Sequence, residues 1–153
     1  MNKNKIGSIL MLLVIVFLGW RVLSLGMADY YAVSNPEKAL FWRANHPEAL
    51  LRMAEKQVAT KRWDQAQALA EQALRANHLD GRPLRVLALV AEHQGDEKRA
   101  FKLFNEAVKL SPRDSVSQLW LLEHALRHQQ AKPAVVHLDA LLRVKPSLIG
   151  ALM

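Results

Sequence analysis

Cysteine is absent from the chain, and glycine and proline are scarce, with six of each among 153 residues. The lack of cysteine excludes a disulfide framework, a thiolate zinc site, a catalytic cysteine and a lipid anchor built on an N-terminal cysteine. The low glycine and proline content excludes a collagen-like fibre. With 51% hydrophobic and 23% charged residues, the chain has the composition of one ordinary domain with a packed core.

Recognisable catalytic motifs are also absent: there is no glycine-rich phosphate loop, no G-x-S-x-G elbow and no H-E-x-x-H sequence. The nearest pattern is Glu123-His124 followed by His128, which puts two imidazoles four residues apart on one helix face. No base stands between these histidines, and no third ligand lies nearby in the sequence, since His137 is remote. We therefore expect no catalytic residue, no cofactor and no metal site.

Basic residues exceed acidic ones in both parts of the chain, and the N-terminus has no acidic residue. The chain has 21 Lys and Arg against 14 Asp and Glu, a net charge of +7, and residues 1–28 supply +3 of it through Lys3, Lys5 and Arg21. The other 125 residues carry 18 basic and 14 acidic side chains, with both signs interspersed. Nucleic-acid-binding proteins usually gather Lys and Arg on one face, so this pattern predicts a solvated mixed surface and no nucleic-acid partner.

One long hydrophobic run stands at the start of the chain. Ile6–Trp20 holds fifteen residues without a charge, and the apolar character resumes after Arg21. As a helix rising ~1.5 Å per residue, Ile6–Leu25 would cover ~30 Å, the thickness of the hydrocarbon core of a bilayer. Trp20 and Arg21 are residue types that suit the membrane–water interface. Residues 1–28 are therefore predicted to form a transmembrane signal anchor.

A cleaved signal sequence is the alternative. Gly26-Met27-Ala28 resembles a small-x-small cleavage site, although the apolar stretch exceeds the 7–15 residues usual for a signal sequence. Lys3 and Lys5 precede the span, and basic residues favour the cytoplasmic side. We expect a single-pass protein of the bacterial inner membrane, with a cytoplasmic N-terminus and a periplasmic body.

A period of 34 residues runs through most of the remaining chain. It aligns three successive units at several positions: Ala66, Ala100 and Ala134; Met53, Leu87 and Leu121; Ala73, Ala107 and Leu141. His78, Pro112 and Pro146 occupy one further position, so two of the three units end in proline. Each unit shows two apolar stripes at helical spacing, separated by a break such as Gly95-Asp96. A small residue at 66, 100 and 134 allows two antiparallel helices to cross closely.

These residues resemble the tetratricopeptide repeat (TPR) family, whose units have the same length and the same order of large, small and bulky residues. The match covers units 47–80, 81–114 and 115–148, and the middle unit carries Leu87, Ala88, Gly95, Ala100, Phe104, Ala107 and Pro112. The first unit departs at Lys61 and His78, and the third at Leu122 and Leu141. The resemblance implies an all-α protein: an N-terminal transmembrane helix followed by an α-solenoid of about three helix-turn-helix units.

Two short segments flank the predicted repeats. In residues 29–46, we expect a linker over 29–33 and a short helix over 38–45, because Pro36 with Glu37 suits a helix start. Residues 149–153 would begin a further helix or end the chain. Solenoids normally close with a polar capping helix, so this apolar end indicates a longer array or a partner.

The resemblance also implies a partner site, a concave groove lined by the first helix of each unit. It places the following residues there: Leu51, Glu55, Arg82, Arg85, Leu89, Glu92, His93, Leu119, Glu123 and Arg127, together with Glu48, Val58, Ala59, Val116 and Leu126. A mixed apolar and charged groove suits a protein or peptide partner. The alternative is that these charges only keep the solenoid soluble. Chaperone-tail binding is not expected, because Leu51, Glu55 and Val86 replace the Lys and Asn that it requires.

Arg82 and Arg85 stand out in this groove, because residues three apart share a helix face. If exposed, they contribute little to folding while offering planar guanidinium groups to the carboxylates of a partner. Of the tryptophans, Trp63 is expected to pack in the core, whereas Trp120 is expected to be partly exposed and Trp42 is undetermined.

Three functions remain open at this point. The first is a non-enzymatic, membrane-anchored scaffold for a bacterial envelope complex, in exopolysaccharide or lipopolysaccharide export, cytochrome c maturation, or pilus or secretion assembly. The second is a periplasmic adaptor released by signal cleavage. The third is a glycan-binding or enzyme accessory module that uses Trp42 or Trp120. The oligomeric state is left open.

Overall fold

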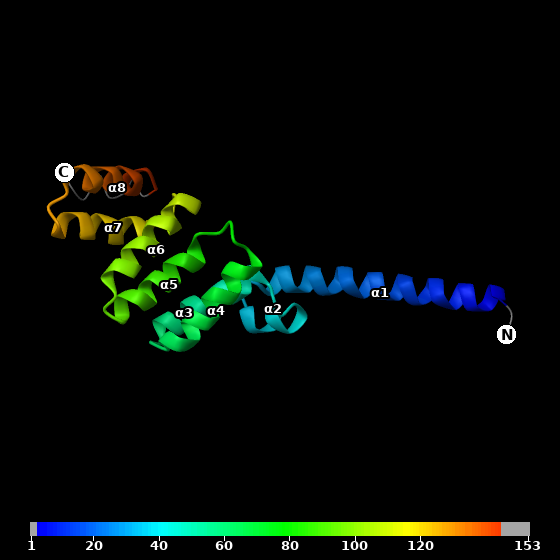
Figure 1. The fold of residues 1–153 in the computed structure, drawn as a ribbon. Helices are drawn as coiled ribbons and strands as arrows, with labels where there is room; N and C mark the ends of the chain where they lie inside the picture. Colours follow the sequence, from blue (N-terminus) through cyan, green and yellow to red (C-terminus); the bar gives the residue numbers. More distant parts are fainter. Residues whose placement is uncertain (1–2, 145–153) are drawn as a thin grey trace.

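A computed structural model of the chain describes residues 3–144, which form eight α-helices and no strand (Figure 1). The helices are α1 (Lys3–Tyr31), α2 (Pro36–Trp42), α3 (Pro47–Ala59), α4 (Trp63–Ala76), α5 (Arg82–His93), α6 (Glu97–Leu110), α7 (Ser115–Arg127) and α8 (Ala131–Val144). The predicted all-α class is confirmed. Residues 149–153, where a further helix was expected, lie outside the described residues.

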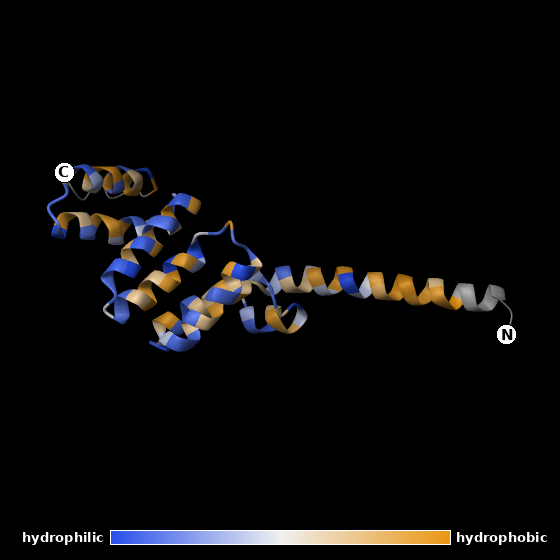
Figure 2. Ribbon diagram, in the orientation of Figure 1, coloured by the Kyte–Doolittle hydropathy of each residue, from blue (hydrophilic) through white to orange (hydrophobic). Residues whose placement is uncertain are grey.

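Helix α1 projects away from the stack of shorter helices as a single rod (Figure 1). Within Ile9–Tyr31, an 18-residue stretch has a mean hydropathy of 2.3 and only 6% of its residues are buried, so the helix is long and apolar enough to cross a membrane. Its large apolar side chains between Ile9 and Leu23 are 50–72% exposed, and most of the rod is hydrophobic in Figure 2. A helix that is apolar on every side needs an apolar environment around it.

The linker predicted over 29–33 is partly wrong, because α1 continues through Tyr31. Asp29 on α1 accepts a hydrogen bond at 2.7 Å from Nε2 of His46, whose Nδ1 accepts from the backbone N–H of Ala49 at the start of α3. Ala49 is also buried against Ala32, with Ala39 of α2 completing the cluster. The first residues after the apolar run that favour a helix break are Asn35 and Pro36, where Asn35 caps α2. The long helix is therefore joined to the solenoid by packed contacts.

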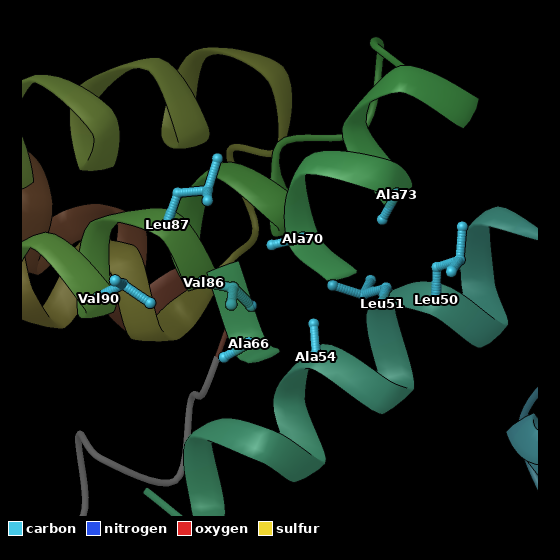
Figure 3. Close-up of a cluster of buried hydrophobic side chains, with 9 residues drawn as sticks. All are labelled: Leu50, Leu51, Ala54, Ala66, Ala70, Ala73, Val86, Leu87 and Val90. Carbon is cyan, nitrogen blue, oxygen red and sulfur yellow. The ribbon is translucent and has the colours of Figure 1, made fainter. Parts of the chain in front are cut away.

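The six helices α3 to α8 pack as three antiparallel pairs, and neighbouring pairs pack on one another. Ala66 and Ala100 are completely buried and Ala134 is 6% exposed, as the 34-residue period predicts for a close helix crossing. Figure 3 shows the first core cluster, to which α3, α4 and α5 contribute. Its members are Leu50, Leu51, Ala54, Ala66, Ala70, Ala73, Val86, Leu87 and Val90.

A second core cluster joins the middle pair to α7. Phe104 of α6 is completely buried, and its ring stacks on Trp120 of α7 with the centroids 4.4 Å apart. Trp120 is only 7% exposed, so the expectation of a partly exposed indole is wrong. The ring packs against α6, and its N–H donates a 2.7 Å hydrogen bond to Glu92 of α5, which satisfies the one polar atom of the indole.

The turn inside each unit has the same backbone form. Lys61, Gly95 and Gln129 stand 34 residues apart and have φ angles of 60°, 77° and 55°, in the left-handed region. In each turn the residue after them donates its N–H to a carbonyl five positions back, as in Arg62 to Gln57. The absence of glycine at position 61 therefore leaves the turn intact, at the cost of a backbone conformation that only glycine adopts freely.

Candidate protein-binding face

The first helices of the three pairs, α3, α5 and α7, carry the residues predicted to face the groove, and we call this surface the A-helix face. Leu51 does not belong to it. This side chain is 1% exposed and lies in the first core cluster between α3, α4 and α5 (Figure 3). Its assignment as a partner-binding residue is wrong, because the turn of α3 that bears it points toward α4 and α5.

Arg82 is held by acidic neighbours. Its guanidinium lies 2.7 Å from Glu48 of α3 and 2.7 Å from Asp80, and the Asp80 side chain also accepts from the Arg82 backbone N–H. Burial alone would raise the pKa of Asp80, but the hydrogen bonds and positive charge of Arg82 outweigh it and bring the pKa below its ordinary value. The hydrogen bond to Asp80 in turn raises the pKa of Arg82. Arg82 is therefore engaged within the chain.

Arg85 is engaged more deeply. Its guanidinium pairs with Glu55 of α3 and with Asp114, which caps the N-terminus of α7. The side chains of Arg85 and Asp114 are only 13% and 6% exposed. Arg85 therefore does not meet the condition of exposure under which a small contribution to folding was expected. One guanidinium joins α3, α5 and the N-terminal cap of α7.

Two further predicted residues of α5 have partners within the chain. Glu92 accepts the hydrogen bond from Trp120, as described above. The ring of His93 stacks on Trp63 with centroids 4.2 Å apart and an interplanar angle of 19°. Trp63 also packs against the first core cluster, as expected for it. The charged and aromatic-stacking residues of the α3 and α5 parts of the A-helix face thus have partners within the chain, while Glu92 and His93 stay exposed to solvent.

Helix α7 differs, because its part of the A-helix face is open. Val116, Leu119 and Leu126 are 45%, 48% and 61% exposed, and Glu123 and Arg127 are exposed beside them. The steps of three and four residues between them put these side chains on one helix face. We call this set the α7 stripe. Leu89 of α5, which the family register also placed in the groove, is half-buried.

A second group of exposed aromatic and basic residues lies where α2 folds back against α1, and we call it the α2 tip. Trp42 contacts Trp20 with centroids 5.7 Å apart, and Phe41 is 84% exposed. Arg21 and Arg43 line the hollow beside Trp42. The α2 tip therefore lies level with Trp20, where the membrane boundary was predicted. Trp42, undetermined from the sequence, packs on the long helix.

The histidine pair of α7 has a third neighbour that the sequence did not indicate. Glu97 of α6 lies 3.5 Å from both His124 and His128, although it is 31 residues from His128 in the sequence. Burial lowers the pKa of His124, with the charge of His128 acting in the same direction. His137 lies apart from them, hydrogen-bonded to Gln118 at 2.8 Å, and burial lowers its pKa as well.

No family model and no curated protein matches the sequence. Solved structures do match the fold. MamA residues 41 to end from Desulfovibrio magneticus RS-1 is 21% identical with a TM-score of 0.55, over 82% of this chain and 71% of that one. YrrB, a TPR protein with an unusual peptide-binding site, is 19% identical with a TM-score of 0.54, over 80% and 68%. Another MamA structure is 13% identical with a TM-score of 0.56, over 86% and 76%. The chain therefore has the TPR fold.

Proposed function

We propose that this protein is a non-enzymatic scaffold, anchored in the bacterial inner membrane by α1, that binds a partner protein of an envelope complex through the α7 stripe. The observation that carries the proposal is the stripe itself: three large apolar side chains about half exposed on one face of a helix. Apolar residues at such spacing suit a partner's amphipathic helix, which contributes its own apolar face. Glu123 and Arg127 offer one charge of each sign to orient it.

The α3 and α5 parts of the A-helix face have a structural role and leave the α7 stripe as the proposed contact surface. Arg85 and Arg82 are paired with carboxylates of their own chain, so they hold the surface in shape. The glycan-binding alternative loses one of its two residues, because a buried Trp120 offers no free ring face. TPR structures similar to this one include a peptide-binding protein, which favours a protein partner.

A photo-crosslinking amino acid at Leu119 should trap the partner in cells, because this position is 48% exposed at the centre of the α7 stripe. The matched control is Lys102, exposed on α6.

We also expect Leu119→Asp with Leu126→Asp to reduce partner capture by at least about tenfold, the loss typical of central apolar contacts. The fold should be retained, since both side chains face solvent. Equal crosslinking at both positions, or unchanged capture by the variant, would remove the stripe as the interface.

The proposed membrane placement puts the N-terminus in the cytoplasm and α2 to α8 in the periplasm. Lys3 and Lys5 before the span support this orientation, and the α2 tip adds Phe41 and Trp42 at the level of Trp20. An interfacial position would suit the exposed Phe41. A cleaved chain would lose residues 1–28, so the mass of the mature protein separates anchor from released adaptor.

Because the chain has no cysteine, single cysteines report its topology without background. We expect Lys98→Cys to react with a membrane-impermeant maleimide in spheroplasts, and Asn4→Cys to react only after lysis. Lys98 is exposed at the start of α6, far along the chain from the span. Labelling of Asn4→Cys in intact spheroplasts with protection of Lys98→Cys would reverse the proposed orientation.

A further inference from the structure

Three metal-ligand side chains converge between the second and third helix pairs. Glu97 is the first residue of α6, His124 lies in the last turn of α7, and His128 is the C-cap residue of α7. Oε1 of Glu97 is 3.5 Å from Nε2 of His124 and 3.5 Å from Nε2 of His128. One ligand atom from each of the three residues lies within 4.8 Å of the others. The three groups come from two different units of the solenoid.

The two separations between Glu97 and the histidines match what a tetrahedral zinc ion requires. Zinc binds imidazole nitrogen and carboxylate oxygen at about 2.0–2.2 Å, so two ligands of one tetrahedral ion lie roughly 3.3–3.5 Å apart. Both distances from Glu97 to the histidines already have this value. Two histidines and one glutamate are also a complete protein ligand set for an open zinc site, with water as the fourth ligand.

The surroundings hold one ligand firmly and leave the others accessible. His124 is 12% exposed, and its ring stacks on Phe101 at 4.6 Å and on Trp120 at 5.2 Å, which fixes its plane. His128 and Glu97 are 48% and 52% exposed, so an ion and its water can enter from solvent.

Two features limit the affinity. Nδ1 of His124 is buried without a hydrogen-bond partner among the described residues, so the proton it would carry when Nε2 binds metal has no acceptor. Arg127, whose guanidinium lies 6.0 Å from the ring centroid of Trp120, adds a positive charge nearby. Both make this a site of moderate strength.

We propose that Glu97, His124 and His128 form a zinc-binding site. Imidazole with a single carboxylate suits zinc and disfavours magnesium or calcium, which prefer sets of oxygen ligands. A bound ion would clamp the first residue of α6 to the end of α7. It would therefore fix the angle between the second and third units, and with it the direction of the α7 stripe. This inference does not depend on the proposed partner.

The test is a zinc titration of the full chain in detergent micelles, purified without a polyhistidine tag and stripped of metal. Competition with a chromophoric chelator should show one zinc ion per chain, and zinc should raise the thermal midpoint of unfolding while magnesium does not. Glu97→Gln and His128→Gln each should weaken zinc binding by at least about tenfold, since each removes a direct ligand. The matched control is His78→Gln, an exposed histidine outside the cluster.

Both test variants change exposed side chains, so the wild-type helical circular dichroism should be retained. Zinc binding by His78→Gln should equal that of the wild type. The proposal is overturned if the wild-type chain binds no zinc, or if Glu97→Gln and His128→Gln bind it as tightly as His78→Gln does. The second result would assign the metal to scattered surface histidines.

Discussion

Replacing Arg85 with alanine is expected to lower the free energy of unfolding by roughly 3–5 kcal/mol, the range for removing one partner from a buried ion pair. The reason is the carboxylates left behind. Asp114 is 6% exposed and Glu55 31% exposed, and both would lose the guanidinium that compensates their charge. Because the three residues join α3, α5 and the start of α7, the loss should also loosen the third unit.

Chemical denaturation of the full chain in micelles, followed by circular dichroism, measures this effect. Arg82→Ala is the matched control, because Arg82 is 37% exposed and its removal should cost about 1 kcal/mol or less. Adding Glu55→Gln and Asp114→Asn to Arg85→Ala should restore part of the stability, since the uncompensated charges are gone and Asn still caps α7. Equal stability of the two single variants would show that Arg85 is not buried between the carboxylates.

The second large effect is expected at Phe104. Phe104→Ala should cost about 3–5 kcal/mol, because truncating a buried phenylalanine removes apolar contacts and leaves a cavity. The ring is completely buried and stacks on Trp120, so the cavity would open between α6 and α7. Tryptophan fluorescence should shift to longer wavelength as water reaches the indole.

Phe41→Ala is the control for Phe104→Ala, because it makes the same chemical change at a side chain that is 84% exposed. Its stability should stay within about 0.5 kcal/mol of the wild type, as for most surface changes. If Phe104→Ala unfolded at the same denaturant concentration as Phe41→Ala, the packing of α6 on α7 described here would be wrong.

The features that the sequence predicted correctly are those that depend on spacing within one helix or one unit. The buried alanines at 66, 100 and 134 follow from the period, and the start of α2 follows from Asn35-Pro36. Proline and capping residues act on neighbours a few positions away, so a linear pattern contains the information.

The features that were missed depend on contacts between units. Arg85 reaches Glu55 and Asp114 across 30 and 29 residues, and Glu97 lies 31 residues from His128. Whether such groups meet depends on the angle between successive helix pairs. The period gives the length of a unit but not this angle, so neither the ion pairs nor the third metal ligand could be read from the spacing.

Trp120 and Leu51 were misplaced for a different reason. Helix α7 has apolar residues on more than one side, so the pattern did not distinguish the buried face from the α7 stripe. In α3 the family register placed Leu51 toward the groove, whereas the helix turns it into the core. A shift of one residue in a helix changes the direction of a side chain by about 100°.

The same rotation applies along α1, which runs without a break from its apolar stretch to the contacts that join it to the solenoid. Asp29 and His46 join the long helix to α3, and no loop intervenes between Trp20 and Tyr31. The number of residues between Trp20 and Tyr31 therefore sets the orientation of the α7 stripe about the membrane normal. If α1 spans the bilayer, the α7 stripe is held at a fixed distance from the membrane surface and in a fixed orientation relative to α1. A partner anchored in the same bilayer then reaches the stripe by lateral diffusion in two dimensions instead of by diffusion through the surrounding volume.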